Sequence, residues 1–82
     1  MVVVAYVTVT MKAGAEKEVL KKVVAFEEVT EVNLLYGEYE ALVKVRVDDL
    51  SQLDKFLTEK LRILPDIFQT TSLIVAKQHK ET

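Results

Sequence analysis

Two different periods of hydrophobic and polar residues alternate along the chain, and the changes of period divide it into six elements. The segment 2–10, VVVAYVTVT, is almost entirely β-branched, which is typical of a strand. From Ala13 onward apolar residues recur every three or four positions, which predicts a helix with a charged outer face. The remaining predicted elements are two strands, a helix and a last strand, at 29–36, 39–47, 50–64 and 67–76. The predicted order is therefore β-α-β-β-α-β.

Local signals specify the connections between these elements. Gly37 and Glu38 predict a tight hairpin between the second and third strands, because glycine readily adopts a positive φ. Asp48 or Asp49 is expected to cap the second helix, with Gln52 as a capping-box partner, and Pro65 to end it. With right-handed crossovers this order gives an α+β, ferredoxin-like fold, an antiparallel sheet with two helices on one face. We expect one domain over 1–77 and a polar tail over 78–82.

The sheet face away from the helices is predicted to be apolar as well. Val2, Val4 and Tyr6 lie opposite the buried side of the first strand, and Leu42 lies among Lys44 and Arg46 on the third. The last strand is apolar on both sides, with Leu73 and Val75 on one and Ile74 and Ala76 on the other. Half of the 82 residues are hydrophobic, whereas a chain of this size buries only about 63% of its surface. We therefore expect sheet-to-sheet packing with an identical subunit, as in dimeric α+β barrels. An ordinary monomer with scattered surface valines is the alternative.

Composition excludes several classes of protein. Eleven Lys and Arg stand against thirteen Asp and Glu, without the basic stripe that nucleic-acid binding requires. No charge-free stretch approaches the ~20 residues of a membrane helix, and no basic segment opens a signal peptide. The absence of cysteine excludes disulfides and thiolate metal sites. We expect a protein of the cytoplasm that contacts neither nucleic acid nor membrane directly.

Few residues offer catalytic chemistry. The single histidine, His79, lies in the predicted tail, where a loose terminus cannot hold catalytic geometry, and the two glycines are isolated. We expect no enzyme activity, no cofactor and no metal. Glu38 and Glu40 fit a solvated hairpin edge better than a two-carboxylate site. Thr70 and Ser72 fit good β-propensity, or hydrogen-bond donors for a small anionic group.

Three segments resemble the effector domain of the Lrp/AsnC family, also called the RAM domain. VNLLYGEYEALVKV at 32–45 resembles its hairpin, and LPDI at 64–67 resembles the turn that the family writes P-G-V. TTSLIV at 70–75 resembles its T-x-T-x-I-V strand, and the resemblance extends over about 4–77. Glu40 stands where the family usually has aspartate, and Tyr36 where it usually has threonine.

The resemblance implies a function and an assembly. Full-length members are transcription regulators with an N-terminal helix-turn-helix domain, whereas this chain opens on the first effector-domain strand, so we expect a stand-alone module. Its expected partners are an identical subunit in a dimer, further dimers in octamer-like or decamer-like rings, a small amino acid between dimers, and full-length regulators. Carried over position by position, the effector-binding residues are Gly37, Glu38, Tyr39, Glu40, Thr70 and Ser72. A purely structural oligomerisation module, or a dimeric α+β barrel enzyme built on Glu40 and the tyrosines, are the alternatives.

Overall fold

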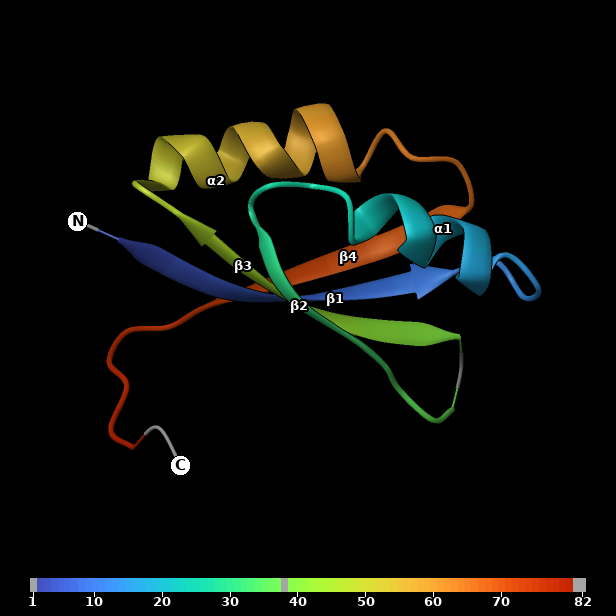
Figure 1. Ribbon diagram of the computed structural model, residues 1–82, viewed down its shortest axis with the longest axis horizontal. Coiled ribbons are helices and arrows are strands. Elements are labelled where there is room, and N and C mark those ends of the chain that lie inside the picture. The colour runs from blue at the N-terminus through green and yellow to red at the C-terminus, as the bar shows by residue number, and fades with distance from the viewer. Residues whose placement is uncertain (1, 38, 81–82) are drawn as a thin grey trace.

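The computed structural model describes residues 2–37 and 39–80 and contains the predicted elements in the predicted order (Figure 1). They are β1 (Val3–Met11), α1 (Glu16–Val23), β2 (Val29–Leu34), β3 (Glu40–Val47), α2 (Leu50–Phe56) with a π-helical continuation η1 (Leu57–Leu61), and β4 (Ile67–Ile74). The sheet order is β2-β3-β1-β4, and every neighbouring pair is antiparallel. Both helices cover the same face of the sheet (Figure 1). The ferredoxin-like α+β fold is confirmed.

Both helices are shorter than predicted, for local reasons. α1 begins at Glu16, three residues later than expected, because Gly14 has a φ of 88°, which lies outside the helical region. The second helix was expected to reach residue 64 but ends at Leu61. There the Arg62 N–H donates to the Leu57 carbonyl at 2.9 Å, the five-residue spacing of a π turn.

The start of α2 follows the predicted capping chemistry. Asp49 is the N-cap, and its carboxylate accepts a hydrogen bond from the Gln52 N–H at 2.8 Å. The Gln52 side chain in turn accepts from the N–H of Asp48 at 3.2 Å, one residue before the cap. Both bonds use donors and acceptors that lie within five residues of one another, which explains why this boundary is readable from the sequence.

Two strands end earlier than predicted. β2 stops at Leu34 and β4 at Ile74, each two residues short of the expected end. The hairpin connection between β2 and β3 therefore occupies residues 35–39, and Glu38 within it lies outside the described residues. The prediction of a tight two-residue connection at Gly37 and Glu38 is wrong, because the connection already begins at Leu35. The Leu35 N–H donates to the carbonyl of Glu40 at 2.9 Å.

The core lies between the sheet and the helices. Alternate residues of β1 and β3 point into it and are buried. From the helical side it receives Val19, Val23, Leu53, Phe56, Leu57 and Leu61. The rings of Phe26 and Phe56 meet edge to face, with centroids 5.6 Å apart. This contact joins the segment after α1 to α2.

Irregularities in the ladder change which side chains share a face. The register between β2 and β3 shifts between Val29 and Glu31, so Val29 pairs with the buried Val45 whereas Glu31 pairs with Lys44. A second shift, between Thr10 and Met11, affects the start of β4. Each shift reverses the alternation beyond it. Glu31 therefore lies on the face without helices, although simple alternation would place it beside Val29.

The face of the sheet without helices, called the open face here, is mixed. Tyr6 pairs with Lys44 on one side and Leu73 on the other, and Thr8 pairs with Leu42 and Thr71. The predicted apolar residues are thus present, but polar ones separate them.

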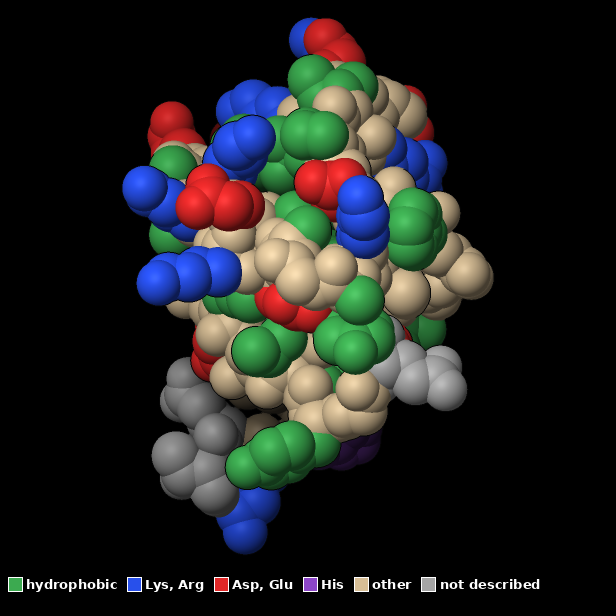
Figure 2. All heavy atoms as spheres, turned by 90° about the vertical axis from the view of Figure 1, so that its right-hand side faces the viewer, with side chains coloured by type: hydrophobic (Ala, Val, Ile, Leu, Met, Phe, Trp, Pro, Cys, Tyr) green, Lys and Arg blue, Asp and Glu red, His purple; other side chains and the backbone are tan. Residues whose placement is uncertain are grey.

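Figure 2 views the molecule from the side at the right of Figure 1; charged side chains gather on the upper, helix-bearing half. Within residues 2–37 and 39–80, neither helix is long and apolar enough to cross a bilayer.

Candidate functional site

The hairpin residues of the predicted site lie at one end of the sheet. Gly37 has a φ of 121° and Tyr39 a φ of 54°, so the chain reverses through left-handed backbone. The carbonyl of Tyr39 accepts from the N–H of Met11 at 2.9 Å, which fixes the hairpin to the end of β1. Glu40 opens β3, is half-buried and pairs with Thr10. Three of the four hairpin residues are thus placed; the fourth, Glu38, lies outside the described residues.

The strand residues of the predicted site lie on β4 and face the helices. Thr70 pairs with Val9 and Ser72 with Val7, and both partners belong to the buried core. The hydroxyl oxygen of Thr70 accepts a hydrogen bond from Nε of Arg62 at 2.9 Å. The hydroxyl oxygen of Ser72 is buried and has no hydrogen-bond partner among the described residues.

One subunit does not bring these two groups together. Glu40 lies on the open face, in a row with Thr10 and Gln69, whereas Thr70 lies on the helix-bearing face. β1 separates their strands, so the backbones are two strand spacings, roughly 10 Å, apart. A single pocket that uses both Glu40 and Thr70 therefore needs two subunits, as the sequence interpretation assumed.

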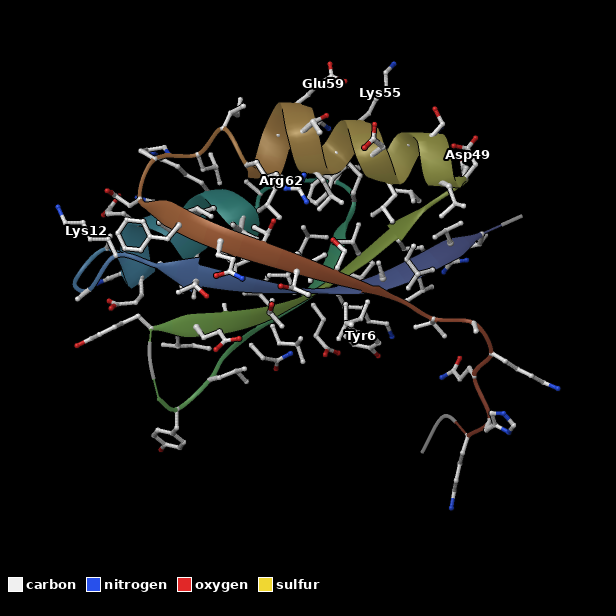
Figure 3. The ribbon with its side chains drawn as sticks, turned by 180° about the vertical axis from the view of Figure 1, so that it is seen from behind. Tyr6, Lys12, Asp49, Lys55, Glu59 and Arg62 are labelled. Atoms are coloured by element: carbon white, nitrogen blue, oxygen red, sulfur yellow. The ribbon has the colours of Figure 1, made fainter. Side chains whose placement is uncertain are left out.

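A hollow beside Thr70 contains a residue that sequence reasoning missed. It encloses about 260 Å³ and is lined by Arg62, Ile67, Phe68, Gln69 and Thr70. Arg62 follows the π turn and reaches from the end of the helix toward β4 (Figure 3). No spacing rule links Arg62 to Thr70, because the turn between them belongs to neither element. Only the packing of the helix end against the strand brings the two side chains together.

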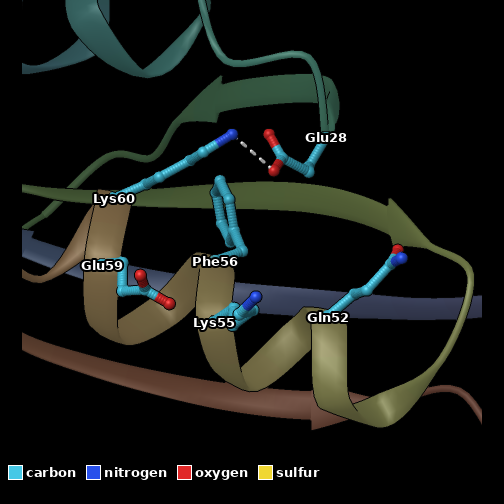
Figure 4. A pocket seen from close by; sticks show the side chains of 6 residues that line it. All are labelled: Glu28, Gln52, Lys55, Phe56, Glu59 and Lys60. Carbon is cyan, nitrogen blue, oxygen red and sulfur yellow. Dashed lines mark hydrogen bonds and ion pairs between the residues drawn. The ribbon is translucent and has the colours of Figure 1, made fainter.

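A second hollow lies between α2 and the segment before β2 (Figure 4). It encloses about 340 Å³ and is lined by Glu28, Gln52, Lys55, Phe56, Glu59 and Lys60. The ammonium of Lys60 and the carboxylate of Glu28 form an ion pair at 2.7 Å. Burial raises the pKa of Glu28, but the hydrogen bond from Lys60, a hydrogen bond from its own backbone N–H and the charge of Lys60 together outweigh burial and hold that pKa below its ordinary value.

The open face carries a third, larger hollow of about 630 Å³ near the C-terminal segment. Lys44 and Arg46 line it together with Tyr6, and the Lys44 ammonium lies 5.8 Å from the centre of the Tyr6 ring. Gln78 and Lys80 border it from the C-terminal segment. None of the five predicted effector-binding residues that the structure describes lines this hollow, so it is separate from them.

The described residues contain no group of three His, Asp or Glu side chains arranged to hold a metal ion. His79 is exposed and lies outside every helix and strand.

The family described as the Lrp/AsnC ligand binding domain matches residues 4–82. The chain belongs to the Lrp/AsnC family. The resemblance seen in the hairpin, the turn and the last strand is thereby confirmed.

Relatives of this Lrp/AsnC domain are transcription regulators. It is 36% identical over 78 residues to the HTH-type transcriptional regulator FL11 of Pyrococcus abyssi, covering 95% of this chain and 51% of that protein. It is 31% identical over 80 residues to the leucine-responsive regulatory protein of Escherichia coli, and the match covers 94% of this chain and 49% of that protein. The chain thus spans about half the length of the curated relatives it matches. These relatives are named as regulators, not as enzymes.

A solved structure shares both the fold and much of the sequence. The crystal structure of a hypothetical protein from Pyrococcus horikoshii superposes with a TM-score of 0.84 and 43% sequence identity. The superposition covers 94% of this chain and 93% of that one.

Proposed function

We propose that this Lrp/AsnC domain binds a small amino acid between subunits and converts binding into a change of assembly. The observation that carries the proposal is the placement of Glu40 and Thr70 on opposite faces of one sheet. Two groups that match the family's effector site can then meet only across a contact between subunits. One of the relatives, the leucine-responsive regulatory protein of Escherichia coli, carries an amino acid in its name.

The chemistry of the predicted residues suits a zwitterion. The Glu40 carboxylate offers an acceptor for an ammonium group, and the hydroxyl of Thr70 on a neighbouring subunit offers a donor for a carboxylate. Gly37 and Tyr39 shape the backbone that would border the ligand. Glu38 and Ser72 complete the predicted set. A ligand that bridges subunits shifts the assembly equilibrium by its differential affinity for the two states.

The surface area of the chain supports a dimer through the open face. The subunit exposes 5869 Å², roughly 900 Å² more than a monomer of its mass is expected to expose, and the C-terminal segment that extends away from the sheet contributes part of that excess (Figure 1). A standard interface buries about 800 Å² on each partner. Packing two open faces together would cover Tyr6, Leu42 and Leu73, and such dimers would join into octamer-like or decamer-like rings. A full-length regulator with the same domain offers the same surfaces, so mixed assemblies are part of the proposal.

The test combines calorimetry with native mass spectrometry. We expect at least one of the twenty amino acids to bind the wild-type chain and to change the distribution of assemblies. Glu40→Ala should abolish or strongly weaken that binding while the ligand-free assembly stays intact. Glu18→Ala, which removes an exposed carboxylate from α1, is the matched control and should bind normally. Binding of none of the twenty would overturn the proposal and favour a purely structural oligomerisation module.

A further inference from the structure

Arg62 is an exposed cation that makes one side-chain hydrogen bond and, among the described residues, forms no ion pair. Its Nε donates to the hydroxyl oxygen of Thr70 at 2.9 Å. The ion pair found among residues 2–37 and 39–80 joins Glu28 and Lys60, and Arg62 forms none there. Its side chain reaches from the helix end toward β4 (Figure 3). The hydrogen bond thus orients Nε of the guanidinium toward Thr70.

The donors that remain free belong to two residues that line the hollow beside β4. After Nε is used, the guanidinium keeps four N–H groups on its terminal nitrogens. Thr70 accepts from Arg62 through its oxygen, so its own O–H proton is still available to donate. Both residues line the same hollow of about 260 Å³. A planar carboxylate matches this arrangement of donors, because a guanidinium binds it in a bidentate manner.

The rest of the hollow is partly apolar. Phe68 lines it with a side chain that is 71% exposed, and Ile67 lies next to it, half-buried. An exposed aromatic side chain beside a cation that forms no ion pair among the described residues suits a ligand with a charged end and a hydrocarbon end. Gln69 supplies one neutral amide at the rim.

We propose that Arg62, together with the hydroxyl of Thr70, binds the carboxylate of an apolar amino acid whose side chain packs on Phe68 and Ile67. This inference rests on the proposed function and refines it. The β4 side of one subunit holds the carboxylate, and Glu40 of another subunit is left to accept the ammonium. Arg62 is then a binding residue that lies outside the hairpin and strand motifs of the family.

The first part of the test varies the ligand, so that the contributions of its carboxylate and its ammonium group are measured separately. Calorimetry on the wild-type chain compares L-leucine, L-leucinamide, which lacks the carboxylate, and 4-methylpentanoate, which lacks the ammonium. We expect leucinamide to bind at least 30-fold more weakly than leucine. If another amino acid of the twenty binds more tightly than leucine, that amino acid and its amide take their place. A polar or acidic amino acid as the tightest ligand would overturn the apolar assignment, and equal binding of acid and amide would overturn the role of Arg62.

The protein half of the test changes the cation and its hydroxyl partner. Arg62→Gln should weaken amino-acid binding roughly 10- to 100-fold, as expected when a hydrogen bond to a charged group is lost. The affinity of Arg62→Lys should lie between those of the wild-type chain and Arg62→Gln, because lysine keeps the positive charge but cannot bind a carboxylate in a bidentate manner. Thr70→Val should weaken binding less than Arg62→Gln. Lys55→Gln, which removes an exposed lysine of α2, is the control and should change affinity less than twofold.

The outcomes distinguish the two proposals. If no amino acid binds the wild-type chain, the proposed function fails and this inference fails with it. If an amino acid binds and Arg62→Gln binds it equally well, the proposed function stands and only this inference is overturned. If Arg62→Gln instead alters the ligand-free assembly and leaves affinity unchanged, the carboxylate that Arg62 binds belongs to another subunit, which also overturns it. Thermal unfolding of each variant checks that it folds.

Discussion

Replacing Leu73 by aspartate tests whether the open face is a contact between subunits. Leu73 lies on β4 beside Tyr6 and is 57% exposed in the single subunit. Val24, at the end of α1, is 59% exposed but lies on the helical side. The two positions are therefore matched in exposure and differ in which surface they occupy. In a monomer, Leu73→Asp and Val24→Asp should each change stability by less than about 1 kcal/mol.

The expected effect on a dimer follows from the exposed fraction of Leu73. Burying a whole leucine side chain stabilises by roughly 1.5–3 kcal/mol, so covering the exposed 57% contributes about 1–1.7 kcal/mol. A two-fold interface contains the residue twice, which gives about 2–3 kcal/mol per dimer. Desolvating two unpaired carboxylates adds to that loss. Leu73→Asp should therefore raise the dimer dissociation constant at least about 100-fold, since each 1.4 kcal/mol is a factor of ten.

Sedimentation over a concentration series measures this constant directly. We expect the wild-type chain and Val24→Asp to share one dissociation constant and Leu73→Asp to be monomeric at the same concentrations. Because the monomer surface is then uncovered, Leu73→Asp should also lose the concentration dependence of its melting temperature. A dimer of unchanged affinity in Leu73→Asp would refute the assignment of the open face. A wild-type chain that stays monomeric at high micromolar concentration would refute the dimer itself.

Two further predictions concern local interactions. Asp49→Ala removes the N-cap of α2, so it should cost about 1 kcal/mol and lower the melting temperature by roughly 4–8 °C. Asp48→Ala keeps the N–H that Gln52 binds and should cost less; equal losses would contradict the cap. Lys60→Met should destabilise by about 1 kcal/mol at pH 7, because it leaves the Glu28 carboxylate, whose side chain is only 22% exposed, without its partner. The pKa of Glu28 is lowered in the folded chain from its ordinary value of 4.5, so the difference should be lost as the pH falls through the lowered pKa, and denaturant titrations that show it unchanged in acid would contradict the pairing.

The expectations that held were those with a local cause. The order of elements follows from the change between β-branched and helical periodicity, and the cap at Asp49 follows from chemistry within a few residues. The burial of alternate residues in β1 and β3 follows from the same alternation in the sequence. The predicted ends of β2 and of the second helix were wrong, because strand pairing and a π turn do not follow from local propensity.

For the candidate site, the sequence by itself determined which residue types are available: an acidic hairpin with a glycine, and hydroxyls along the last strand. Only the tertiary structure decided that Glu40 and Thr70 occupy opposite faces, that Arg62 donates to Thr70, and that Lys60 pairs with Glu28. The reason is physical. Which face a strand residue occupies depends on register, and one extra residue in a bulge reverses it. Contacts across 32 residues, such as Lys60 with Glu28, depend on how the helix packs, which no short spacing in the chain encodes.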